Sequence, residues 1–188
     1  MESLILPVHL KRWQGFKRSR VSGLECQAHN PQERYDIEMR YAVLSVLIFL
    51  LDLGIKNRIE ENKTEGETEE VFNGRLLIRK YHNRGAALDV GEKRSGLVAL
   101  FSLALTLAMT VVFLLTFSIR GGKLLKTGLA MLLGGAYSNT YDRLRRHYVV
   151  DYVSFPVKNP AIRRIVFNIS DFCIMIGALC MVLGSAGM

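Results

Sequence analysis

The sequence has few of the residues on which metal, redox and thiol chemistry usually depend. It contains three cysteines and four histidines in 188 residues. The histidines show no spacing typical of a metal site. Cys173 and Cys180 lie in one apolar segment, about 10 Å apart along a helix, which is too far for a disulfide. We therefore predict neither a metal nor a cofactor, and we interpret these two cysteines as packing residues.

Charge is missing from long stretches of the chain. Residues 95–119 contain no charged side chain, and residues 165–188 contain only Asp171. A helix of about 20 apolar residues is long enough to cross the hydrocarbon core of a bilayer, whereas soluble core helices are rarely apolar on every side for that length. These runs predict a membrane protein.

Four apolar blocks follow a polar, basic N-terminal arm at residues 1–40, which lacks the pattern of a signal peptide. The blocks show no alternation of polar and apolar residues, so we expect helices, because backbone groups inside a bilayer must be bonded within their own segment or in a closed barrel. The predicted fold is an all-α membrane protein, a bundle of four transmembrane helices within residues 41–188. The helices are expected at about 41–56, 95–119, 124–141 and 165–188.

The predicted extracytoplasmic insert at residues 57–94 begins with an acidic, polar loop. Apolar runs at 71–72 and 76–78 then flank Asn73-Gly74, a pattern typical of a β-hairpin with a tight turn. We expect a small sheet at the membrane surface. The connection at 142–164 contains Pro156 and Pro160 and cannot be one straight helix.

The net charge is +8. Because the basic residues lie between the apolar blocks and no nucleic-acid motif accompanies them, we predict membrane lipids as partners and no nucleic acid. The basic cluster at 120–126 favours the cytoplasm for that loop, although the basic residues summed over all loops do not. We expect both termini to be cytoplasmic, with 57–94 and 142–164 outside.

Two aspartates in apolar surroundings are the strongest candidates for chemistry. Asp171 lies in the last apolar block, three residues after Asn168 and on the same helix face. Asp151 interrupts the otherwise uncharged stretch 148–153. Close carboxylates cannot both ionise, so such a pair can share a proton and activate water. The alternative is that these acids form ion pairs at helix ends, with Arg143, Arg163 or Arg164.

The end of the third block carries a polar stripe. Gly135, Asn139 and Asp142 recur at helical spacing, and glycine permits close helix approach. Asn139, Asp142 and Arg143 are expected to line a polar pocket, unless Asp142 and Arg143 form only an interfacial ion pair.

The remaining polar positions suggest support for a site. Asp52 and Lys56 are four residues apart on the first helix, an acid and a base on one face, which favours a structural ion pair. Residues 83–87 form a loop of small residues around Gly85 that lets a backbone approach closely. No serine stands out as a nucleophile for Lys56.

Taken in order, these segments resemble the lipoprotein signal peptidase (signal peptidase II) family across about 120 residues. The matching segments are Asp52-x-x-x-Lys56, Asn83-x-Gly85-Ala86-Ala87, Gly134-Gly135-Ala136-x-x-Asn139-x-x-Asp142-Arg143, Val149-Val150-Asp151-Tyr152 and Asn168-x-x-Asp171.

The resemblance implies a four-helix bundle in the bacterial cytoplasmic membrane, with a small extracytoplasmic sheet and a site near the outer face. It implies cleavage of the signal peptide from prolipoproteins that carry a diacylglyceryl cysteine, and sensitivity to cyclic-peptide antibiotics. It also implies that Asp151 and Asp171 are the catalytic pair. We expect substrate contacts from Asn83, Asn139, Arg143 and Asn168, and structural support from Asp52, Lys56, Gly85, Gly135 and Asp142.

The chain departs from the family pattern at several positions. The family usually has Phe at Leu88 and Tyr152, Gly at Ser138 and His147, and Ala at Ser170. Ser138 and Ser170 place hydroxyls close to the expected site. The alternative function is a non-enzymatic membrane module, either a paralogue that binds lipidated peptides or a bundle whose acids carry protons.

Overall fold

The structure is a computed structural model that describes residues 31–85, 94–118 and 121–186. Cys26, Ala86, Ala87 and Leu88 lie outside the described residues. The chain forms two units, residues 1–39 and 40–188. Of the first unit the structure describes only the start of a helix, so the site and its supports are features of the second.

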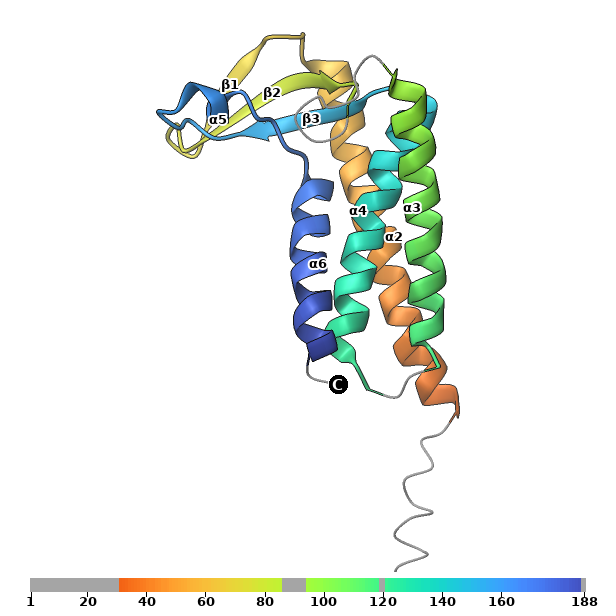
Figure 1. The fold of residues 1–188 in the computed structure, drawn as a ribbon. Helices are drawn as coiled ribbons and strands as arrows, with labels where there is room; N and C mark the ends of the chain where they lie inside the picture. The colour runs from red at the N-terminus through yellow and green to blue at the C-terminus, as the bar shows by residue number, and fades with distance from the viewer. Residues whose placement is uncertain (1–30, 86–93, 119–120, 187–188) are drawn as a thin grey trace, which may run out of the picture. The chain divides into compact units, whose positions relative to one another are not determined.

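Long helices build most of the second unit, which confirms the helical prediction (Figure 1). The third long helix, α4, packs against α3 and α6, and α2 approaches α4 where Gly134 lies against the backbone of Ser45. Within the described residues, α3 and α6 are long and apolar enough to cross a membrane. The helices are α2 (Pro31–Asn62), α3 (Ser95–Thr116), α4 (Lys123–Arg145), the short α5 (Pro160–Arg163) and α6 (Ile169–Ala186).

Glycines set the close approach of α4 and α6. A Cβ atom added to Gly128 would lie 2.6 Å from the carbonyl oxygen of Gly177, and one added to Gly135 would lie 2.5 Å from that of Ser170. Small residues let helix backbones approach in this way. The contact at Gly135 brings the first turn of α6 against the segment of α4 that carries Asn139.

Three antiparallel strands form a sheet at one end of the helices (Figure 1). The strands β1 (Thr68–Val71) and β2 (Leu76–Asn83) form the predicted hairpin. The loop between them has positive φ at Phe72, Asn73 and Gly74, and the amide of Arg75 donates to the carbonyl of Phe72. The third strand, β3 (Val149–Ser154), pairs with β2 and was not predicted.

The predicted bounds of the first and last helices are wrong. The first helix extends beyond 41–56 at both ends, from Pro31 to Asn62, so the insert begins as helix rather than as a loop. The last helix starts at Ile169 instead of residue 165. Phe167 instead bonds to β3. Its carbonyl oxygen accepts from the amides of Tyr152 and Val153, and its own amide donates to the carbonyl oxygen of Val153.

His147 lies between α4 and β3, where the chain reverses, and its φ of 68° is in the left-handed region. Side chains other than glycine adopt this region uncommonly, and histidine is among the better tolerated. The turn delivers β3, and with it Asp151, to the sheet edge beside α6.

Candidate active site

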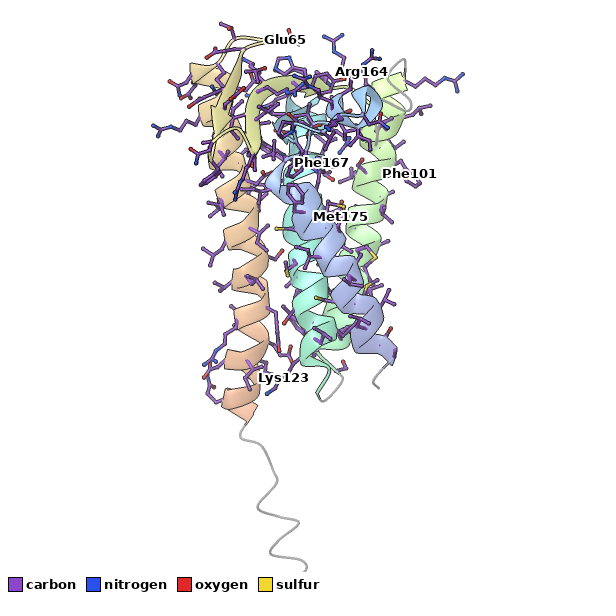
Figure 2. The ribbon with its side chains drawn as sticks, turned by 90° about the vertical axis from the view of Figure 1, so that its left-hand side faces the viewer. Glu65, Phe101, Lys123, Arg164, Phe167 and Met175 are labelled. Carbon is purple, nitrogen blue, oxygen red and sulfur yellow. The ribbon has the colours of Figure 1, made fainter. Side chains whose placement is uncertain are left out.

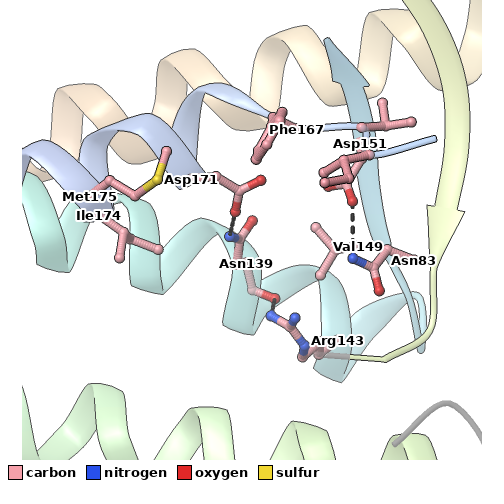
Figure 3. A pocket seen from close by; sticks show the side chains of 11 residues that line it. Asn83, Asn139, Arg143, Val149, Asp151, Phe167, Asp171, Ile174 and Met175 are labelled. Atoms are coloured by element: carbon pink, nitrogen blue, oxygen red, sulfur yellow. Dashed lines mark hydrogen bonds between the residues drawn. The ribbon is translucent and has the colours of Figure 1, made fainter. Parts of the chain in front are cut away.

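One cavity of about 380 Å³ lies where the sheet meets α4 and α6 (Figure 3). Its polar lining comes from Asn83, Asn139, Arg143, Asp151 and Asp171, and its apolar lining from Val149, Ile165, Val166, Phe167, Ile174 and Met175. Figure 3 shows Asp151 from β3 and Asp171 from α6 facing the same space. The structure therefore brings together the two aspartates that the sequence singled out.

Asp151 is almost completely buried, with 3% of its surface exposed. Its carboxylate accepts hydrogen bonds from Asn83 Nδ2 at 3.0 Å and from Asn168 Nδ2 at 2.7 Å. Burial first, and then the neighbouring carboxyl group of Asp171, raise the pKa of Asp151 from its ordinary value of 3.8 to about 7. Asp151 can therefore exchange a proton near neutral pH.

Asp171 takes part in a capping box at the start of α6. The side-chain oxygen of Asn168 accepts from the Asp171 amide at 2.8 Å, and the Asp171 carboxylate accepts from the Asn168 amide at 3.0 Å. Such reciprocal bonds satisfy two orphan donors of a helix N-terminus. Asn139 Nδ2 donates a further bond to Asp171 at 2.9 Å. The carboxylate is thus held in one orientation.

Asn168 does not contact the cavity, contrary to the predicted substrate contact. It is fully buried, and its amide nitrogen donates to both Asp151 and Asn139. Together with the capping box, these bonds tie Asn168 to both carboxyl groups. Asn168 therefore fixes the spacing of the Asp151 and Asp171 carboxyl groups from behind the cavity.

Asn139 and Arg143 reach the cavity from α4, as predicted. The Arg143 guanidinium donates to the carbonyl oxygens of Asn139 at 3.4 Å and Gly85 at 3.2 Å. Its Nε is buried and has no hydrogen-bond partner among the described residues. Asn83 turns back on its own loop, because its side-chain oxygen accepts from the Gly85 amide at 3.0 Å. Gly85 therefore connects Asn83 to Arg143.

Asp142 does not line the cavity and has no salt bridge with Arg143, so the expected position in the pocket and the alternative ion pair with Arg143 are both wrong. It is fully buried behind the site, 3.1 Å from Lys56 and 3.4 Å from Arg146. Lys56 also lies 2.8 Å from Asp52, which is the pair predicted on the first helix. The three charges form one cluster that is closed to solvent.

Lys56 connects this buried cluster to the cavity. Its ammonium donates to the side-chain oxygen of Asn139 at 2.8 Å. The same oxygen accepts from Asn168 at 3.2 Å, so the amide nitrogen of Asn139 must point to Asp171. Lys56 thereby fixes the amide orientation that the Asp171 carboxylate requires.

Three hydroxyls that the sequence pattern did not assign converge on Asp52. Ser138 and Ser170 donate to its Oδ2 at 2.7 and 2.5 Å, and Tyr152 donates to its Oδ1 at 2.8 Å. Their shared carboxylate partner is more than 80 residues away in sequence, so no local spacing could have revealed it.

The raised pKa of Asp151 makes the stability of the fold depend on pH. In the unfolded chain this acid has its ordinary value of 3.8, whereas in the fold the pKa is about 7. The stabilisation that comes from protonated Asp151 is complete below 3.8 and is lost as the pH rises through 7. We expect the melting temperature to fall between pH 5 and pH 8.

Thermal unfolding at these two pH values measures this slope. Asp151→Asn should flatten it, because asparagine does not ionise. Glu61→Gln, which removes a solvent-exposed acid of α2, should leave it as in the wild type. A wild-type melting temperature that rises from pH 5 to pH 8 would contradict the burial of an ionisable Asp151.

The fold and the site define the class of protein. Two apolar helices of membrane-spanning length and a cavity lined by one buried and one half-buried carboxyl group are typical of a membrane-embedded enzyme with acid–base chemistry. The family model for signal peptidase (SPase) II matches residues 44–186. The chain therefore belongs to the signal peptidase II family, and it is a peptidase.

Curated relatives agree with this assignment. A lipoprotein signal peptidase of Lactiplantibacillus plantarum is 30% identical over 77% of this chain and 92% of its own length. Another, from Alteromonas mediterranea, is 35% identical over 77% of this chain and 79% of its own length.

Two solved structures share the fold. Both are described as bacterial membrane enzymes determined by the in meso method. One is 21% identical with a TM-score of 0.67 and covers 79% of this chain and 88% of its own. The other is 22% identical with a TM-score of 0.63 and covers 77% of this chain and 90% of its own.

Proposed function

We propose that this protein is an intramembrane aspartyl endopeptidase that removes the signal peptide from lipid-modified prolipoproteins, with Asp151 and Asp171 as the catalytic pair. The observation that carries the proposal is that both carboxyl groups face one cavity while Asn168 bonds to both of them. Family membership supports the substrate class, because the curated relatives are lipoprotein signal peptidases.

The chemistry needs one ionised and one protonated carboxyl group. With its pKa near 7, Asp151 can hold the proton of the pair at neutral pH. The ionised partner removes a proton from water as that water attacks the scissile carbonyl carbon, and the protonated partner donates to the carbonyl oxygen. When the C–N bond breaks, the leaving nitrogen takes a proton from the pair. A hydroxyl of the tetrahedral intermediate returns one proton to the pair as the carbonyl re-forms, and this restores the starting state.

The cavity lining suits a substrate with an apolar end and a peptide backbone. Six apolar side chains line one part of the cavity, and the amides and guanidinium line the other. The unpartnered Nε of Arg143 is a donor for a carbonyl or phosphate oxygen. We place the substrate backbone near Asn139 and Arg143, with Asn83 approaching from β2. Cyclic-peptide inhibitors of the family would compete for the same space.

Arg143→Lys is expected to lower the cleavage rate about tenfold or more, because lysine keeps the charge but loses the planar fork that bonds Gly85 and reaches the cavity. Arg145→Lys, on the exposed face of the same helix, is the matched control and should cleave as the wild type does. Initial rates on a lipid-modified precursor measure both. A wild-type rate for Arg143→Lys would leave Arg143 as a simple interfacial charge.

We further propose that α2 and α4 also cross the bacterial cytoplasmic membrane. Large apolar side chains of α2 are exposed on its outer surface, among them Val43, Leu47 and Leu51, as lipid contact requires. Neighbouring elements cover much of the surface of α4. Its polar residues are therefore shielded from lipid, and the helix can still cross the membrane. This arrangement makes the protein multi-pass, with the sheet and the site at the outer face.

The orientation can be tested by labelling single cysteines in intact cells. Residues 65 and 123 lie at opposite ends of the unit formed by residues 40–188 (Figure 2). A cysteine in place of Glu65 should react with an impermeant reagent from outside, and one in place of Lys123 should not. The opposite labelling pattern would reverse the orientation.

The function itself is tested with one precursor prepared with and without a diacylglyceryl group on its cysteine. Purified protein in a bilayer should cleave the lipid-modified form only, and a metal chelator should not slow it. Binding of the modified precursor without cleavage would identify the protein as a non-enzymatic binding module instead.

A further inference from the structure

The buried carboxylate of Asp52 takes no part in the proposed mechanism. Asp52 has no exposed surface. Its Oδ2 accepts from the Ser138 and Ser170 hydroxyls and lies 2.8 Å from the Lys56 ammonium. Its Oδ1 accepts from the Tyr152 hydroxyl, the one donor to this oxygen within the part of the chain that the structure describes. The tyrosine therefore has a separate connection to the cluster.

Tyr152 follows Asp151 in β3. Successive side chains of a strand point to opposite faces, so the ring of Tyr152 points away from the face on which Asp151 lies. It is 3% exposed and does not line the cavity. Any influence of this residue on the reaction must be transmitted through its bonds, because it lies outside the space that the substrate would occupy.

The Tyr152 hydroxyl makes a second bond that leads to the catalytic helix. It accepts from the backbone N–H of Ile169 at 3.1 Å. Ile169 is the first residue of α6, and the first N–H groups of a helix have no partner within the helix. The hydroxyl thus satisfies a helix-terminal donor while Asp52 orients the hydroxyl. Asp171 lies two residues further along the same turn.

We propose that Tyr152 is a positioning residue: its hydroxyl, held by Asp52, fixes the first turn of α6 against β3 and so sets Asp171 at its working distance from Asp151. This inference rests on the proposed function, because a working distance has meaning only if the two carboxyl groups act as a pair. The backbone bonds of Phe167 hold the chain two residues earlier, and the tyrosine hydroxyl extends that attachment into the helix.

The kinetic test compares Tyr152→Phe with Tyr141→Phe. Both changes remove one hydroxyl and keep the ring, but Tyr141 is on α4, 40% exposed, and outside the site. Because a misplacement of about 1 Å can lower a rate about 100-fold, we expect kcat of Tyr152→Phe to fall about tenfold or more. KM should stay the same, because the ring does not line the cavity. The control should keep both wild-type constants.

A structural readout keeps the inference separate from the proposed function. In Tyr152→Phe the Ile169 amide loses its partner, so its hydrogen exchange should become at least tenfold faster, whether or not the protein cleaves any substrate. Unchanged exchange would overturn the positioning bond even if the enzyme is active. Conversely, faster exchange in a protein without peptidase activity would leave the bond standing and overturn the proposed function.

A second variant removes the same bond from the other side. Proline is tolerated at the first position of a helix and has no N–H, so Ile169→Pro deletes the donor and leaves the bond between Tyr152 and Asp52. Ile169→Pro should lower kcat as Tyr152→Phe does, and it still tests the bond if Tyr152→Phe does not fold. The double variant should be no slower than the slower single variant. Wild-type kcat in the folded single variants, or multiplied losses in the double variant, would overturn the inference.

Discussion

Asp151→Asn and Asp171→Asn are each expected to lower the rate of prolipoprotein cleavage about 1,000-fold or more while the protein remains folded. Asparagine has the size of aspartate but cannot transfer the proton that acid–base catalysis needs. In Asp171→Asn the new amide oxygen can still accept from the Asn168 amide, so the cap of α6 is kept. The measurement is the initial rate on a lipid-modified precursor, together with the melting temperature.

The two losses should not multiply. Residues that act as a unit show strongly non-additive effects, so the double variant should be about as slow as either single variant. Asp36→Asn removes an exposed acid outside the site and should cleave at the wild-type rate. Rate losses that multiply in the double variant would mean that the carboxyl groups act independently.

Lys56→Met is expected to destabilise the protein by about 3–5 kcal/mol. Removal of one partner from a buried ion pair leaves an uncompensated charge, and here two buried carboxylates, those of Asp52 and Asp142, would lose the same ammonium. Asn139 would also lose the donor that fixes its amide. The melting temperature should therefore fall by several degrees, and cleavage should slow as well.

Two comparisons identify the cause. Lys158→Met removes an exposed lysine and should change stability by less than about 0.5 kcal/mol, as surface substitutions usually do. Adding Asp52→Asn to Lys56→Met removes one of the unpaired charges and should recover part of the lost stability. A melting temperature for Lys56→Met equal to that of the wild type would show that the buried cluster is not held by its charges.

The helices, the hairpin and the two aspartates could be predicted because each has a local signal. A long uncharged run specifies a helix in a membrane, Asn73-Gly74 specifies a tight turn, and a single acid in an apolar stretch is conspicuous. The spacing of Asn168 and Asp171 also matches a capping box, which could have predicted where α6 begins. Pro31 at the start of α2 is a further local signal that was available.

The strand β3 and the partners of Asp52 had no such signal. All six residues of β3 are buried, so its sequence lacks the alternation that marks a half-buried strand. The bonds from Ser138, Tyr152 and Ser170 to Asp52 join elements distant in the chain. Periodicity describes which face of an element is apolar, but it cannot identify which distant side chain will meet that face.

The most direct test of the account is the mass of the products that the purified wild-type protein releases from a diacylglyceryl-modified prolipoprotein in a bilayer, measured beside folded Asp171→Asn. The account predicts two products from the wild type, the free signal peptide and a chain that begins at the lipid-modified cysteine, and none from the variant. Release of the same signal peptide by Asp171→Asn that melts at the wild-type temperature would contradict it.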